Sequence, residues 1–127
     1  MKLRPFSAVD GTPFSVSREE VLRVHGKPVR QGRNGIGLNE LDYEDVVFRF
    51  QDSGRLEEVT AQAPVLDLGK VSVPFPALER FVLENDPCAF ERAGFVVSPA
   101  FGLAFDPHCP SWVTALAEHC IAQWQAL

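Results

Sequence analysis

Cysteine and histidine, the residues best suited to metal binding or nucleophilic chemistry, gather in the last third of the chain. Cys88 stands alone, whereas His108-Cys109 and His119-Cys120 are adjacent pairs. A zinc site needs four converging nitrogen or sulfur ligands, but neighbouring residues on a helix point about 100° apart. No C-x-x-C or H-x-x-x-H spacing is present. The pattern therefore predicts neither a metal nor another cofactor, and Cys120 is interpreted as a small core residue.

Catalytic motifs are also missing from the sequence. Cys88 is predicted near the start of a short helix, which lowers a thiol pKa, yet no base is placed beside it and simple packing explains it equally well. No serine lies in a G-x-S-x-G elbow. The glycines from Gly32 to Gly37 neither follow a strand nor open a helix, as a phosphate loop does. The sequence thus favours a non-enzymatic protein and predicts no catalytic residue.

Carboxylates form the most suggestive pattern. Glu40, Asp42 and Glu44 alternate with apolar residues, so in an extended chain all three would share one face. A solvated sheet face is one interpretation; an acidic face that steers a basic protein partner is the other. The spacing is not that of an EF-hand. The candidate partner-binding residues, including those of the adjoining hairpin, are Glu40, Asp42, Glu44, Asp45, Glu57 and Glu58.

A second possibility is a pocket where the proline-rich loop near residue 110 meets the predicted C-terminal helix. Its candidate lining residues are Phe101, His108, Cys109 and Trp112. An apolar cleft with a few polar groups at this place would indicate a small enzyme or a small-molecule binder. These two hypotheses remain open, together with a structural role through homo-oligomerisation.

Composition and charge limit the function classes. The chain has 127 residues, 46% of them hydrophobic, and a net charge of −5, which is typical of one globular domain over residues 1–127. Residues 1–33 carry seven basic and three acidic side chains, whereas residues 34–60 carry two basic and seven acidic ones. Nucleic-acid binding is not expected from this balance. With no signal peptide, no membrane span and three cysteines, the sequence predicts a cytoplasmic protein.

The elements that must position these residues are predicted by pattern. Residues 1–14 and the glycine-rich residues 29–39 are expected to be an irregular lead-in and a mobile loop. Ser17 and Glu20 form a capping box that opens a helix over residues 18–25, with Val21, Leu22 and Val24 as its buried stripe. Residues 45–51 alternate as a strand. Leu56 to Ala61 returns as its hairpin partner, with a bulge or a late start because Leu56 and Val59 have opposite parity.

The second half is expected to hold a middle helix pair, a hairpin and a long terminal helix. Helices are predicted from Pro76 to Asn85 and after Asp86-Pro87, strands over 95–97 and 103–105, and a helix from Pro110-Ser111 to the end. Extended segments are expected at 65–68 and 71–75. The fold class is therefore α+β, with an antiparallel sheet of about four to six strands packed by these helices and an N-terminal short helix.

Two segments resemble known bacterial proteins. The helix followed by Leu41-Asp42-Tyr43, Val46 to Phe50 and Gly54-Arg55-Leu56 resembles the helix-hairpin unit of BamE (small protein A) and of β-lactamase inhibitory proteins. The stretches from Gly94 to Pro107 and from Trp112 to Ala115 are similar to segments of toxin-immunity proteins of unknown function. The resemblance implies a binding role, and an immunity-type inhibitor that covers a basic toxin is the expected form.

Overall fold

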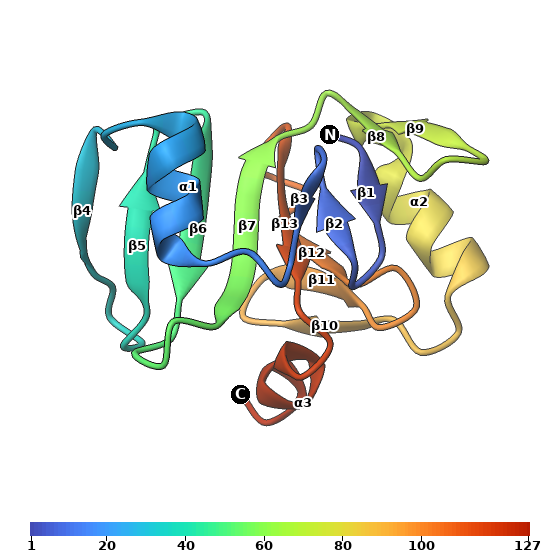
Figure 1. The fold of residues 1–127 in the computed structure, drawn as a ribbon. Helices are drawn as coiled ribbons and strands as arrows, with labels where there is room; N and C mark the ends of the chain where they lie inside the picture. Colours follow the sequence, from blue (N-terminus) through green and yellow to red (C-terminus); the bar gives the residue numbers. More distant parts are fainter.

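The computed structural model describes residues 1–127 and has an α+β architecture built around one large antiparallel sheet (Figure 1). Its eight strands are β4 (Arg30–Arg33), β5 (Asn39–Asp42), β6 (Val46–Phe50), β7 (Leu56–Gln62), β10 (Phe90–Arg92), β11 (Phe95–Ser98), β12 (Leu103–Phe105) and β13 (Trp112–Leu116). They are arranged in the order β10-β11-β12-β13-β7-β6-β5-β4. The α+β class is confirmed, but the expected four to six strands are too few.

The sheet consists of two meanders that meet in the middle. Strands β4 to β7 follow one another along the chain and pair as neighbours, and so do β10 to β13. The two sets join where β7 pairs with β13, with Thr60 opposite Thr114. Because consecutive strands are linked by short connections, antiparallel pairing is the natural result.

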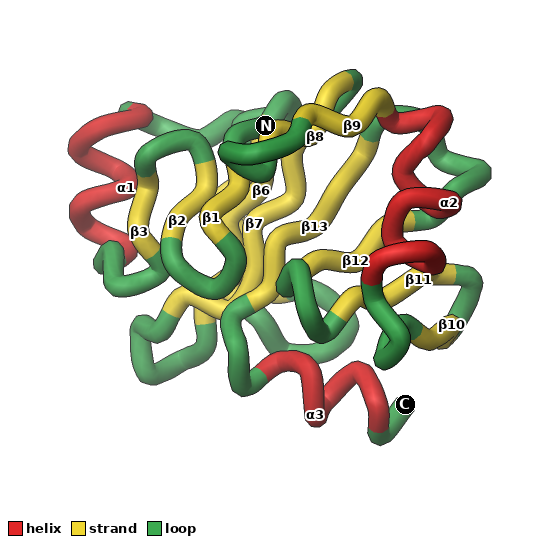
Figure 2. The backbone as a smooth tube through the Cα atoms, turned by 90° about the vertical axis from the view of Figure 1, so that its right-hand side faces the viewer, coloured by secondary structure: helices red, strands yellow, loops and turns green.

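One face of this sheet carries the main hydrophobic core. Helix α1 (Arg18–His25) lies over β5 and β6, and three short strands, β1 (Leu3–Arg4), β2 (Ala8–Val9) and β3 (Thr12–Pro13), lie over the middle of the sheet around β7 and β13. Helix α2 (Phe75–Asn85) and the hairpin of β8 (Val65–Asp67) with β9 (Ser72–Pro74) supply further core residues on this face. Figure 2 shows α2 above β11 and β12, with the C-terminal helix on their other side. The sheet residues buried here include Leu41, Phe48, Phe50, Val59, Val96, Leu103, Phe105, Val113 and Ala115.

Helix α1 has the predicted bounds and the predicted cap. The Glu20 backbone N–H donates to the Ser17 hydroxyl at 3.1 Å, and the Ser17 N–H donates back to the Glu20 carboxylate at 3.3 Å. Gly26 ends the helix with a positive φ of 78°, a conformation that suits glycine. Val21 is buried as expected, but Val24 is 68% exposed, so the apolar stripe is narrower than predicted.

Two segments expected to lack regular structure form strands instead. Within residues 1–14, β1, β2 and β3 make a small antiparallel sheet that buries Leu3, Ala8 and Val9. Within residues 29–39, Arg30 to Arg33 pair with β5 as the sheet's edge strand. All four residues of β4 are exposed. A fully exposed edge strand has no alternating apolar pattern, which is why sequence reasoning assigned a loop here.

The predicted middle helix pair is also wrong, because only α2 forms. Asp86 does not cap a second helix, and the chain turns directly into β10. The buried Asp86 carboxylate instead accepts hydrogen bonds from the Ser98 hydroxyl at 2.7 Å, the Ala100 N–H at 3.0 Å and the Cys88 N–H at 2.9 Å. Burial raises the pKa of Asp86, but these three bonds outweigh it and hold that pKa below its ordinary value.

The long C-terminal helix is the largest error in the sequence prediction. Residues 112–116 form β13 in the middle of the sheet, and the helix α3 covers only Cys120–Gln125. Val113 and Ala115 face the main core while Trp112 and Thr114 face the other way, which is a period-two pattern. The apolar spacing of this stretch also fits a helix, so periodicity alone did not separate the two.

Helix α3 packs on the sheet face opposite to the main core. Its Cys120 joins a smaller buried cluster with Val97, Ala104, Leu116 and Ala117. This cluster covers only the β11–β13 part of that face. The rest of the face, over β4 to β7, has no helix on it, and we call it the open face (Figure 1).

The predicted irregularity in β7 is confirmed as a β-bulge. Arg49 lies opposite Glu58 and Phe50 lies opposite Leu56, so Glu57 is the extra residue without a partner on β6. The bulge lets Leu56 and Val59 both face the main core although they have opposite parity. It also turns Glu57 out of the regular alternation.

Candidate functional site

A groove runs along the open face between the β4–β5 connection and the C-terminal end of α3. Its volume is about 420 Å³, within the range of ordinary ligand sites. The floor comes from β5, β6, β7 and β13, and aromatic rings stand at the sides. The lining residues are Asn34, Gly35, Ile36, Glu40, Arg49, Glu58, Thr60, Phe95, Asp106, Cys109, Trp112, Thr114 and Trp124.

Arg49 is the centre of the groove floor. Its guanidinium donates to the Glu40 carboxylate at 2.7 Å and to the Thr60 hydroxyl at 2.6 Å, and it lies 3.6 Å from Glu58. The Thr60 and Thr114 hydroxyls bond to each other at 2.7 Å. These contacts run across β5, β6, β7 and β13, because cross-strand partners project from the same face of a sheet.

The groove has an excess of negative charge. Glu40, Glu58 and Asp106 line it against the single guanidinium of Arg49. Burial raises the pKa of Glu58, and the nearby carboxylates of Glu57 and Glu40 add to that rise, while Arg49 opposes it. A cationic group placed in the groove would stabilise the charged forms of these carboxylates.

The predicted acidic residues do not form one continuous face. Glu40, Asp42 and Glu58 share the open face, where Asp42 pairs with Arg30 at 3.0 Å. Its pKa is lowered by the Glu44 backbone N–H and by Arg30. Glu44 lies after the end of β5 with a positive φ of 73°.

The other two predicted acidic residues do not lie on the open face. Asp45 lines a cavity on the opposite side of the sheet, with Phe48 and Val59 of the main core. Glu57 is only 1% exposed, so its carboxylate cannot meet a partner at the surface. The prediction that Glu57 belongs to an accessible acidic face is therefore wrong, because His119 and Cys120 at the start of α3 cover its carboxylate.

The predicted alternative pocket is divided in the same way. Cys109 and Trp112 line the groove, beside Asp106. Phe101 instead packs against Phe81 of α2, with ring centroids 5.3 Å apart. His108 is exposed, and its backbone N–H donates a hydrogen bond to the Asp106 carboxylate at 2.8 Å. The four residues therefore do not form one pocket.

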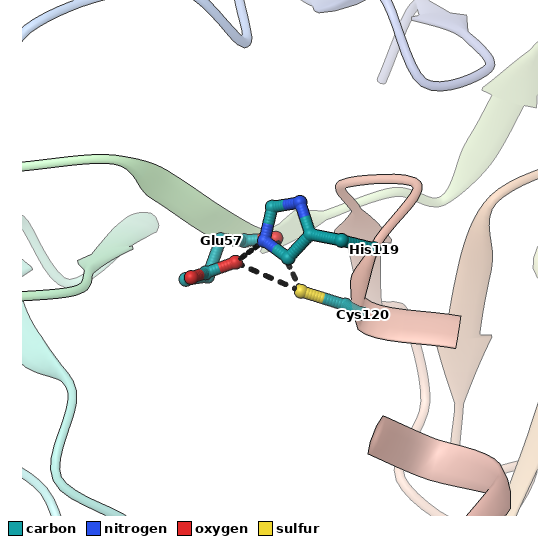
Figure 3. A group of neighbouring side chains, drawn as sticks. All are labelled: Glu57, His119 and Cys120. Atoms are coloured by element: carbon teal, nitrogen blue, oxygen red, sulfur yellow. Dashed lines mark hydrogen bonds and ion pairs between the residues drawn. The ribbon is translucent and has the colours of Figure 1, made fainter. Parts of the chain in front are cut away.

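A second cluster lies behind the groove, at the bulge of β7. The Glu57 carboxylate meets the His119 imidazole through Oε2 and Nε2, and the Cys120 Sγ lies 3.1 Å from the same oxygen (Figure 3). Arg55 binds the other oxygen of Glu57 at 3.2 Å. Burial raises the pKa of the Cys120 thiol far above its ordinary value, and the hydrogen bond with Glu57 adds to that rise. The thiol is thus protonated and unsuited to nucleophilic attack.

Sequence reasoning missed the residues that organise both places. Arg49, Thr60 and Thr114 were assigned no role, although the alternation of residues 46–50 already placed Arg49 on the polar side of a strand. Thr114 would have been found only if residues 112–116 had been interpreted as a strand. Glu57 and Cys120 are 63 residues apart, and no local pattern links them.

Comparisons with known proteins give no relative for this chain. No family model, curated protein or solved structure matches it. None of the three helices is both long and apolar enough to span a bilayer. The function must therefore be argued from the geometry of the groove and its charges.

Proposed function

We propose that this protein is a non-enzymatic binding module that docks a basic segment of a protein partner in the groove of its open face. The observation that carries the proposal is the charge of the groove, which has three carboxylates and one guanidinium on a sheet face without a covering helix. Carboxylates arranged in this way speed the approach of a basic partner and select against acidic ones.

The groove walls suit the stems of basic side chains. Trp112, Trp124 and Phe95 line it beside the carboxylates. Lysine and arginine pack their aliphatic stems on apolar surface, and their charged groups are attracted to aromatic faces. An immunity-type inhibitor that covers the basic active site of a toxin would use such a surface, and this is the specific form of the function that we propose.

The test compares two doubly neutralised variants of the protein. One variant removes two groove carboxylates (Glu40→Gln with Asp106→Asn), and the control removes two helix carboxylates of the other face (Glu19→Gln with Glu84→Gln). Binding to a fluorescent peptide of alternating arginine and glycine is measured by anisotropy, with a glutamate-glycine peptide as the acidic counterpart.

The groove variant should bind the basic peptide roughly tenfold more weakly than the wild type, and the control within about twofold. The acidic peptide should not bind either protein. During the titration, the backbone amide signals of Arg49, Thr60 and Thr114 should shift in NMR spectra. Equal losses in both variants, or shifts confined to the helical face, would contradict the proposal.

A small-molecule binder is the second candidate, favoured by the size of the groove and by Cys109 and Trp112 at its side. A fragment screen by NMR separates the two. Neutral aromatic fragments that shift the Trp112 indole in wild type and in the groove variant alike would favour this candidate over peptide docking.

A further inference from the structure

Three side chains with different ligand atoms converge at the bulge of β7. The carboxylate of Glu57, the imidazole of His119 and the thiol of Cys120 place one ligand atom each within 4.8 Å of one another. Figure 3 shows the His119 and Cys120 side chains reaching from the start of α3 towards the same carboxylate oxygen. Neither the groove nor its proposed function uses this cluster.

We propose that Glu57, His119 and Cys120 bind a divalent transition-metal ion, with zinc as the best fit. Thiolate and imidazole ligands select zinc-like ions over calcium and magnesium, which prefer oxygen alone. Ligand atoms around a tetrahedral zinc ion, at about 2.0 to 2.3 Å from it, lie roughly 3.3 to 3.8 Å apart. The 3.1 Å between Cys120 Sγ and Glu57 Oε2 is close to this spacing. His119 Nε2 lies nearer to the same oxygen, so the partly exposed imidazole must move outward to admit the ion.

Charge balance favours a doubly charged ion at this place. Glu57 and Cys120 are 1% and 3% exposed, so charges on them are poorly solvated. A dication bound by one carboxylate, one thiolate and one neutral imidazole gives a neutral group, and the charge of the half-exposed Arg55 beside it is solvated. The thiol proton of Cys120 is released to solvent when the sulfur binds the metal. The two buried ligands therefore carry no net charge once the ion is bound.

The surroundings hold the ligands in position. Arg55 bonds to the Glu57 oxygen that faces away from Cys120, and such outer contacts orient a ligating carboxylate. The Ala117 N–H donates to the Glu57 carbonyl at 2.9 Å, and the Cys120 N–H donates to the Ala117 carbonyl at 3.0 Å. These backbone bonds fix the start of α3 against β7, so the ion would join the helix to the sheet.

Three protein ligands leave one coordination position for a small external ligand. A cavity of about 240 Å³ reaches Glu57 and Cys120, and its walls include Leu38, Phe95 and Trp124. Water or a small ligand with an apolar body would take this position. A three-ligand set with access from a cavity differs from the closed four-ligand set of purely structural zinc sites.

The experiment titrates the chelator-treated full chain with Co²⁺ and then with Zn²⁺. We expect one Co²⁺ per chain, a thiolate-to-cobalt charge-transfer band and the intense visible bands of tetrahedral cobalt, all displaced by Zn²⁺. Cys120→Ser should abolish the charge-transfer band, and His119→Gln should weaken Zn²⁺ binding roughly 100-fold or more. The midpoint of thermal unfolding should rise with Zn²⁺ in the wild type and not in Cys120→Ser.

The second histidine-cysteine pair supplies the matched control. His108→Gln with Cys109→Ser changes the same residue types at an exposed loop outside the cluster and should leave the titration unchanged. His119 is partly exposed, so its variant is expected to fold, which circular dichroism checks. A folded wild-type protein that shows no charge-transfer band, or a band lost in the control and kept in Cys120→Ser, would overturn the proposal.

Discussion

The two faces of the large sheet are built by opposite means. The covered face is filled with buried Leu, Val and Phe side chains under α1, α2 and the small sheets. The open face presents Arg49, Glu40 and Thr60, which are half-buried, and Arg49 bonds to the other two. Apolar burial provides most folding free energy, whereas half-buried polar contacts contribute less because they replace hydrogen bonds to water. The comparison separates the residues that hold the fold from the residues that are free to bind.

The strongest test of this comparison removes one large side chain from each face of the same strand. Phe50→Ala on the covered face should lower the free energy of unfolding by about 3 to 5 kcal/mol, because it leaves a cavity in a close-packed core. Val47→Ala, on the open face, should lower it by less than about 1 kcal/mol. Urea denaturation of both variants measures the difference. Equal losses would show that both faces support the fold alike.

The next test addresses the buried polar network around Asp86 on the covered side. Asp86→Asn replaces a buried carboxylate that accepts three hydrogen bonds and should cost roughly 2 to 3 kcal/mol at pH 7. The folded pKa of Asp86 lies below its unfolded value of about 3.8. Its contribution is therefore complete above that value and is lost as the pH falls through the folded pKa.

Measuring the stability difference between the wild type and Asp86→Asn at several pH values controls for effects other than the carboxylate charge. Urea midpoints at pH 7, 5 and 3 should show the wild type and Asp86→Asn differing by the same amount at pH 7 and 5, and by less at pH 3. A difference that stays constant down to pH 3 would mean that the carboxylate charge does not stabilise this network.

The smallest expected effects lie on the open face and compare two arginines. Arg49→Gln leaves Glu40 and Glu58 without their shared partner and should lower the free energy of unfolding by roughly 1 to 3 kcal/mol. Arg30→Gln breaks a pair in which Arg30 is 65% exposed and should cost about 0.5 kcal/mol or less. Thermal or urea unfolding measures both. If Arg30→Gln lowers the free energy of unfolding as much as Arg49→Gln does, burial does not determine how much these ion pairs stabilise the fold.

Sequence patterns correctly predicted the elements that are determined by residues close together in the chain. The Ser17 capping box, the alternation of residues 46–50 and the parity conflict at Leu56 gave α1, β6 and the bulge correctly. Where a segment depends on distant partners, local reasoning failed. Residues 112–116 fit a helical period but become a strand because β7 and β12 flank them. Tertiary pairing overrides propensity in such segments.

The candidate sites follow the same division. Glu40, Glu58, Cys109 and Trp112 were selected from the sequence and line the groove, although no local signal joined them. Arg49, Thr60 and Thr114 complete the groove through strand register, which the sequence does not state. The cluster of Glu57, His119 and Cys120 depends on a bulge and on a contact between distant segments. The sequence therefore identified some of the participants and missed how they are assembled.

The pairing of β7 with β13 also bears on how fast the chain can fold. Each meander pairs strands that are neighbours in the chain, so closing its short loops costs little conformational entropy. The pairing of β7 with β13, which we call the seam, joins Thr60 to Thr114, and these residues are 54 positions apart. Forming it closes a long loop, so the chain loses entropy before the new contacts compensate for that loss. High separation of contacts slows folding. The seam that completes the floor of the groove is thus the contact expected to limit the folding rate.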